Sequence, residues 1–99
     1  MKHMVNKICI IRSYASGVHF GIIHETRDTL HGLSVTLKNS RRIHYWEGSC
    51  SLSQVAMEGI KTGRVAIELP EIQVENVIEI IPMSAAAIDN LKNQPVWKS

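Results

Sequence analysis

The chain has 99 residues, 44% hydrophobic and 20% charged, a composition that fits one ordinary globular domain and argues against a disordered chain. Its formal charge of +2 is far from the strongly basic balance of proteins that coat DNA, so a nucleic-acid partner is not expected. The longest apolar runs are too short to cross a membrane, and the opening residues 1–7 are too polar for a signal peptide. We therefore expect one domain over residues 1–99, working in a cytoplasm, with Cys9 and Cys50 reduced and near the core.

The first third of the chain predicts a hairpin. The β-branched run from Ile8 toward Ser13 predicts a buried strand, and a turn leads from it into a second strand over Val18–His24. Gly21 inside that strand predicts a bulge or a close approach of two backbones. Residues 25–32 are polar and lack periodicity, so they predict a loop.

The middle of the chain predicts two extended segments joined by a turn. Apolar and polar residues alternate over 33–38, as in a half-buried strand, and Asn39–Ser40 predicts a tight turn. Residues 41–46 then resume an extended segment. Strict alternation would place Arg42, His44 and Trp46 on one face, and Arg41, Ile43 and Tyr45 on the other.

The second half predicts a helix, further strands and a second helix. Ser51 and Gln54 have capping-box spacing ahead of an apolar stripe, and Gly59 or Gly63 can end that helix. Residues 65–69 alternate before Pro70 interrupts them, and residues 72–81 predict a long, partly bent strand.

A second, short helix follows near the end of the chain. Ser84 can cap it, it runs through Leu91, and Trp97 in the tail is expected to pack back onto the sheet. The expected fold class is α+β: a small, mostly antiparallel sheet of five or six strands with two short helices.

No catalytic constellation is recognisable in the sequence. His24-Glu25 begins like a zinc-protease motif but lacks the second histidine one helical turn later. A two-histidine phosphodiesterase needs two His-x-Thr pairs, and only His24-Glu25-Thr26 is present. Paired carboxylates and glycine-rich phosphate loops are also missing from the pattern. We therefore expect a binding protein without a cofactor or a metal, and not an enzyme.

The segment from Lys38 to Trp46 carries the strongest binding signal. It has three cations, no acid and two adjacent aromatic residues. A guanidinium group matches a phosphate with two parallel hydrogen bonds, and aromatic rings stack on bases, so Arg41, Arg42, Tyr45 and Trp46 fit a nucleotide pocket. In the alternative interpretation the aromatic pair fills the core and Arg41 only pairs with a strand carboxylate.

Serines at 49, 51 and 53 surround the start of the first predicted helix. Exposed amides and hydroxyls at a helix start favour an anion, although one serine is needed for capping in any case. The short sequence distance from Arg41 and Arg42 suggests that a phosphate could be held between them and this helix start.

Four stretches together resemble a widespread family of small bacteriophage proteins: Ser13–Gly21, Arg41–Gly48, Ser51–Gly59 and Ile78–Pro82. The resemblance extends from about Ile8 to Trp97. It implies an immune-evasion sponge of the anti-CBASS kind, which sequesters a cyclic dinucleotide such as cGAMP without degrading it, in the cytoplasm of the infected bacterium. The nearby alternative is the Thoeris anti-defence sponge, which captures a cyclic ADP-ribose variant.

The resemblance also implies site residues and an assembly. It points to Arg41, Arg42, Tyr45 and Trp46, and to the helix start with Ser51, Ser53 and Gln54; Ser13, Tyr14 and His19 of the first hairpin are further candidates. A nearly two-fold ligand suits a two-fold interface, so we expect a homo-oligomer, a dimer at minimum and a tetramer by resemblance.

Three other interpretations remain open at this stage. The basic aromatic segment could bind DNA or RNA, with an affinity that falls steeply as salt rises. His19, His24 or His44 could cleave the cyclic nucleotide. The chain could also be a structural accessory protein that meets other phage proteins.

Overall fold

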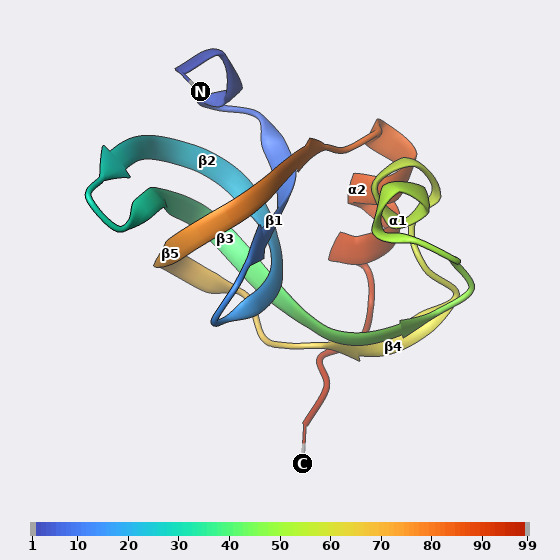
Figure 1. Ribbon diagram of the computed structural model, residues 1–99. Coiled ribbons are helices and arrows are strands. Elements are labelled where there is room, and N and C mark those ends of the chain that lie inside the picture. Colours follow the sequence, from blue (N-terminus) through green and yellow to red (C-terminus); the bar gives the residue numbers. More distant parts are fainter. Residues whose placement is uncertain (1, 99) are drawn as a thin grey trace.

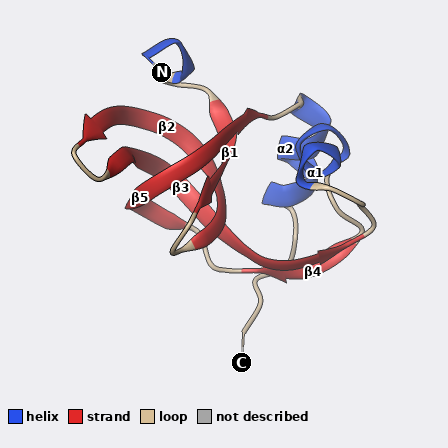
Figure 2. Ribbon diagram, viewed as in Figure 1, coloured by secondary structure: helices blue, strands red, loops and turns tan. Residues whose placement is uncertain are grey.

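Five strands and two α-helices make up the computed structural model, which describes residues 2–98 (Figures 1 and 2). The α+β class expected from the sequence is confirmed. In chain order the elements are a short 3-10 helix η1 (Lys2–Met4), β1 (Ile8–Ser13), β2 (Gly17–Thr29), β3 (Gly32–Glu47), α1 (Leu52–Glu58), β4 (Thr62–Val65), β5 (Leu69–Pro82) and α2 (Ala85–Lys92).

The strand pairings close into a ring. β1 pairs with β2 on one side and β5 on the other, and β3 also pairs with both β2 and β5. All of these pairings are antiparallel, so β1, β2, β3 and β5 form a small barrel. Among the strands, β4 pairs with the far end of β3 alone, beyond the part that contacts β5.

Alternate residues of the four strands that form the ring, β1, β2, β3 and β5, belong to two different hydrophobic clusters. On β1, Cys9 and Ile11 belong to the barrel cluster, which lies among the four ring strands, while Ile10 belongs to the helix cluster outside the ring. Both faces of β1 are therefore buried, which explains its continuous apolar run. The barrel cluster comprises Cys9, Ile11, Ile23, Val35, Leu37, Val74 and Val77.

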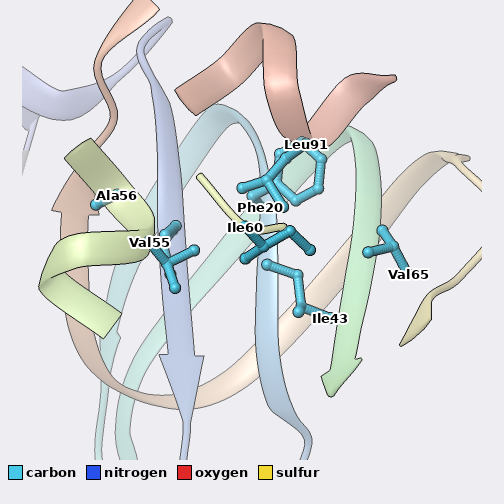
Figure 3. Packing of buried hydrophobic residues seen from close by; sticks show 8 residues of the cluster. Phe20, Ile43, Val55, Ala56, Ile60, Val65 and Leu91 are labelled. Carbon is cyan, nitrogen blue, oxygen red and sulfur yellow. The ribbon is translucent and has the colours of Figure 1, made fainter. Parts of the chain in front are cut away.

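The helix cluster lies where α1 and α2 cover the outer face of the sheet. Figure 3 shows Phe20 and Leu91 drawn above Ile60 and Ile43, with Val55 on α1, all members of this cluster. Its buried members are Ile10, Phe20, Ile43, Val55, Ala56, Ile60, Val65 and Leu91. Helix packing thus covers one face of the sheet and leaves the barrel side free to build a pocket.

Two segments expected to be loop or turn are strand. β2 continues through residues 25–29 because these polar residues pair with β3, where both faces can stay in water. Asn39–Ser40 is a bulge inside the continuous strand β3, with Asn39 at φ 51°, and not a tight turn. Gly21 lies opposite this bulge, and a Cβ there would come within 2.9 Å of the Lys38 carbonyl oxygen. The close backbone approach predicted at Gly21 is confirmed.

A second bulge in β3 changes which side chains share a face. Ile43 pairs with Val65 and Tyr45 with Arg64, so His44 is an extra residue in β3. Strict alternation therefore fails: Tyr45 lies exposed beside His44, and Trp46 packs with the helix cluster. The expectation that Trp46 shares a face with Arg42 and His44 is wrong.

The helix boundaries follow the capping chemistry expected for both helices. The Ser51 side chain accepts from the Gln54 amide, as in a capping box, and Gln54 Oε1 accepts from the amide of Cys50, the residue before the N-cap. Gly59, at φ 80°, ends α1. Ser84 caps α2 by accepting from the Ala87 amide.

The segment after β4 differs in detail from its expected pattern. β4 ends at Val65, residues 66–68 form a connector, and β5 begins at Leu69 with Pro70 inside it. The tail returns to the sheet, because the Trp97 amide donates to the Val65 carbonyl and Val96 bridges Val65 in parallel. The expected packing of Trp97 is confirmed. Cys50, by contrast, is exposed, while Cys9 is buried as expected.

Arg41 joins β3 to the connector and to α2. Its side chain is only 4% exposed, and its guanidinium donates at 2.8–3.2 Å to five backbone carbonyl oxygens. Two acceptors, Val65 and Ala66, flank the end of β4, and three lie at the C-terminal end of α2 on Leu91, Lys92 and Gln94. That helix end carries partial negative charge, which suits a buried cation. The donors of Arg41 are therefore used by the fold, and its expected role as a ligand contact is corrected.

Replacement of Arg41 by Met should cost about 3–5 kcal/mol of unfolding free energy, because buried carbonyl groups lose their partner. Arg12→Met is the matched control. Arg12 is half-exposed and pairs with Glu79 at 2.9 Å, so its loss should cost less than about 1 kcal/mol. Urea unfolding of both variants measures the difference, and equal losses would contradict the role of Arg41.

Candidate functional site: a basic pocket beside the C-terminal tail

One pocket of about 220 Å³ opens on the barrel side of β3. The connector and the start of β5 form one wall, and β3 forms the other. Its lining residues are His19, Ser40, Arg42, His44, Ala66, Ile67, Leu69 and Ile72. His19 and Arg42 are direct cross-strand neighbours, so they share this face of the sheet.

Arg42 is the pocket's cation. It follows Arg41 directly in β3, and strand alternation sends its side chain to the opposite face. The side chain is half-buried, and no side-chain hydrogen bond or ion pair within residues 2–98 engages its guanidinium. A guanidinium with free donors in an otherwise largely apolar pocket is suited to an anionic group.

His19 forms the buried floor of the pocket. It is 1% exposed, and its Nε2 lies 3.1 Å from the Ser16 hydroxyl. Burial, with smaller contributions from Arg42 and His44, lowers the pKa of His19 to about 4, against a weaker opposing effect of Ser16. The ring is therefore neutral at neutral pH and can serve as a hydrogen-bonding group without adding charge.

A row of rings and a second arginine border the pocket. The His44 ring lies 5.3 Å from the Trp97 ring, centroid to centroid. The Arg64 guanidinium lies 5.5 Å from the Trp97 ring and 5.7 Å from the Tyr45 ring, within the range of cation–π contacts. Trp97 is 43% exposed and Tyr45 48% exposed, so both rings have free surface. The row offers stacking surface next to the cation of the pocket.

Glu68 adjoins the pocket wall in sequence but forms no ion pair with Arg42 among residues 2–98. Glu68 stands in the connector between Ile67 and Leu69, and its carboxylate accepts from the Asn39 side chain at 3.1 Å. No carboxylate and no cysteine belongs to the lining set. The electrostatic character of the pocket is therefore positive.

Several expected site residues lie elsewhere. Trp46 packs against the helix cluster and its indole donates to the Ser49 carbonyl at 3.2 Å, which is the core-filling alternative for this residue. Ser51 and Gln54 cap α1, Ser53 is exposed on it, and none of the three lines the pocket. The hypothesis of a phosphate between the arginines and this helix start finds no support in this placement.

In the first hairpin, Ser13 and Tyr14 also lie outside the pocket that His19 lines. The Ser13 hydroxyl is buried and donates to the Glu75 carbonyl at 2.7 Å, so it fixes the turn. Tyr14 is 85% exposed and borders a different hollow, together with His31 and Asn76. Of the ten expected residues, the structure brings His19 and Arg42 together, with Tyr45 close by at the rim.

Sequence reasoning missed His44, Arg64 and Trp97 as parts of one site. Strict alternation already places His44 on the face of Arg42, and the bulge then leaves Tyr45 on this side as well; a bulge leaves no mark in hydrophobic periodicity. Arg64 and Trp97 meet because the tail bridges to β4, a contact over more than thirty residues of sequence. The placement of Trp97 on the sheet was expected, but its neighbours were not.

The described residues carry no other recognisable centre. Within residues 2–98, no cluster of three or more His, Cys, Asp and Glu side chains is arranged to hold a metal ion. Neither α1 nor α2 approaches the length and apolarity that a membrane-crossing helix requires.

The lowered pKa of His19 predicts a pH-dependent stability. Between pH 6.5 and pH 4 the unfolded chain binds a proton at this residue that the folded chain does not, so stability falls as the pH falls. The expected loss from this residue between about pH 7 and about pH 5 is roughly 2 kcal/mol. Urea unfolding at both pH values measures it, and His19→Gln, which cannot titrate, should remove about that much of the pH dependence. An unchanged dependence in the variant would contradict this account.

The comparisons with known proteins give one match. No curated protein and no solved structure matches the chain. The model of a family described as a domain of unknown function, DUF6948, matches residues 6–91. The chain therefore belongs to the DUF6948 family.

Proposed function

We propose that this protein binds and sequesters a cyclic dinucleotide of the cGAMP type in the pocket of Arg42, without cleaving it. As a phage immune-evasion protein it would act in the cytoplasm of the infected host, removing the signal of a CBASS defence. The observation that carries the proposal is the half-buried Arg42 guanidinium, whose donors no group in residues 2–98 engages.

The chemistry of the pocket supports a nucleotide in particular. Arg42 can bind a phosphate with two parallel hydrogen bonds, and the exposed rings of Trp97 and Tyr45 can stack on a base. Neutral His19 and the Ser40 hydroxyl add polar groups to a wall that is otherwise formed by Ala66, Ile67, Leu69 and Ile72. A pocket of apolar walls with few polar groups is the usual form of a small-molecule site.

The size of the pocket supports a ligand shared between two copies. A volume of about 220 Å³ falls below the ~300–1,000 Å³ typical of pockets for drug-sized ligands. It suits one nucleotide half of a cyclic dinucleotide, and a second pocket can take the other half. The two-fold character of the ligand then matches a two-fold arrangement of protomers.

Sequestration of a signal requires a large binding free energy. Nanomolar capture requires about 12 kcal/mol, whereas stacking supplies ~1–3 kcal/mol per base and each charge-assisted hydrogen bond ~1.5–3 kcal/mol. Two half-sites, each with an arginine and stacking rings, can supply this total if they are preformed. Arg42 is held in a strand and Trp97 is fixed by its backbone bond to Val65, so both are largely preformed.

Sequestration without cleavage is supported by the lining residues. Acid–base chemistry at neutral pH works best with a pKa near 7, and the pKa of His19 is about 4. No carboxylate lines the pocket to act as its partner. We therefore infer that the ligand is held and not transformed.

Isothermal titration with a panel of cyclic dinucleotides and cyclic ADP-ribose variants tests the proposal. Arg42→Ala should weaken binding of the best ligand by about 10- to 150-fold, the equivalent of one charge-assisted contact. Arg12→Ala is the matched control, because it removes an exposed arginine elsewhere and should leave the affinity unchanged. Equal affinity in Arg42→Ala, or no binding by any member of the panel, would contradict the proposal.

Recovery of the ligand separates sequestration from the alternatives. After incubation the protein is denatured by heat and the nucleotide is analysed by chromatography; intact cyclic ligand is the expected result. Linear products would identify an enzyme instead. A preference for cyclic ADP-ribose variants would favour the Thoeris alternative, and binding of DNA or RNA with a steep salt dependence would favour a nucleic-acid-binding protein.

A further inference from the structure

The outer part of β2 is an edge strand that the chain leaves unpaired on one side. β1 pairs with β2 only over residues 17–22, and beyond it the Ile23 amide and carbonyl bond to Lys7 and Asn6. Residues 25–29 pair with β3 on their other side, His24 lies at a register shift, and within residues 2–98 no segment pairs with the outer edge of residues 24–29. Figure 1 shows this part of β2 running out, away from both helices, toward the β2–β3 turn. An unpaired edge of this kind is a template for another strand.

Four side chains on this edge have no partners among residues 2–98, whereas Thr29 at its end donates to the Gly32 carbonyl oxygen. His24, Glu25, Arg27 and Asp28 are all exposed, and none makes a side-chain hydrogen bond or an ion pair within residues 2–98. By contrast, the exposed charges Arg12 and Lys38 on neighbouring strands pair with Glu79 and Glu71. Charges of both signs without a partner among residues 2–98 thus stand side by side on this free edge.

We propose that two copies of this chain associate through this edge, with Thr26 of each copy opposite the partner's Thr26 in an antiparallel pair. The two-fold register then sets Glu25 against the partner's Arg27 and, at the ends, His24 against the partner's Asp28. Opposite charges that face each other directly across an antiparallel pair attract, and like charges repel. Glu25 and Arg27 each gain an oppositely charged neighbour in this register, and the Asp28 carboxylate can accept a hydrogen bond from the partner's His24 ring.

Neighbouring registers lack this property. A shift of one residue sets Glu25 against the partner's Asp28, which opposes two acids, and a shift the other way sets Arg27 against the partner's His24. Because this part of β2 is exposed on both faces, no buried face fixes the register, and the order of the charges has to select it. The charge order of residues 24–28 therefore selects one symmetric pairing, and closed two-fold pairing is the commonest form of self-association.

Charged edge strands also serve to prevent association, which is the opposite outcome. The mixed signs and their mirrored order favour pairing, because a protective edge needs only charges of one sign. The interface is independent of the nucleotide proposal: it uses none of the residues that line the Arg42 pocket. The interface can therefore be present whether or not the pocket binds a nucleotide.

Charge swapping tests the interface on the full chain without ligand. Sedimentation equilibrium from micromolar to millimolar protein should show a monomer–dimer equilibrium. Glu25→Arg and Arg27→Glu, each alone, should weaken it about tenfold or more, because two-fold symmetry makes each change act twice. The double variant Glu25→Arg/Arg27→Glu should restore it, since the swapped charges again face their opposites. Glu58→Arg, on the exposed side of α1, is the control and should leave the dimer unchanged.

A cysteine probe tests the register itself. Directly opposed residues of an antiparallel pair have Cα atoms about 4.5–5.5 Å apart, which suits a disulfide. Thr26→Cys in a Cys50→Ser background should form a disulfide-linked dimer with oxidised glutathione, and Thr62→Cys in the same background should not. A chain that stays monomeric at millimolar concentration, single reversals without effect, or a double swap that fails to restore the dimer would each overturn the proposal. Arg42→Ala should dimerise as the parent does, so failure of the nucleotide site cannot be mistaken for failure of this interface.

Discussion

The buried guanidinium of Arg41 is the contact on which the arrangement of this protein depends. It holds together three segments that are distant in sequence: the middle of β3, the end of β4, and the C-terminal end of α2. A buried cation without a carboxylate partner is tolerable here because five carbonyl dipoles surround it. Burial lowers the pKa of Arg41, and the negative charge of Glu68 opposes that shift by a smaller amount. The geometry of the connector, and so one wall of the pocket, follows from this contact.

Arg41 and Arg42 are neighbours in β3, but the first stabilises the fold and the second lines the pocket. They are adjacent, and alternation sends one guanidinium into the helix side and the other into the pocket on the barrel side. They differ in their partners: Arg41 donates to five carbonyl oxygens, while Arg42 is half-buried and its guanidinium has no partner within the described residues. His44 lies on the pocket side by alternation, the bulge after it leaves Tyr45 on the same side, and the tail brings Trp97 beside His44.

The fold could be predicted from the sequence where local chemistry decides it. Ser51, Gln54 and Ser84 cap helices as their spacing indicates, and Gly21 marks a close approach as an isolated strand glycine should. The extension of β2 through residues 25–29 could not be predicted, because a strand exposed on both faces has no hydrophobic alternation. The bulges at Asn39 and His44 were equally invisible, since a bulge changes the face of a side chain without changing the composition around it.

The candidate site was predictable only in part. A run of cations and rings in the middle of the chain indicated the region, but the partners of each residue are set by contacts across the sheet. The carbonyl groups that engage Arg41 come from residues 65–94, and no local pattern could show that they would meet there. For the same reason the helix start at Ser51, close to Arg42 in sequence, takes no part in the pocket.

Amide chemical-shift mapping tests the central claim most directly, because it reports where a ligand binds without any substitution. Titration of the isotope-labelled protein with a cyclic dinucleotide should shift the amides of His19, Arg42, His44 and Ile67, and the indole signal of Trp97. Those of α1 and of the outer part of β2 should stay in place. Shifts centred on Ser51–Gln54 or on the hollow at Tyr14, or a spectrum that the ligand leaves unchanged, would contradict the account.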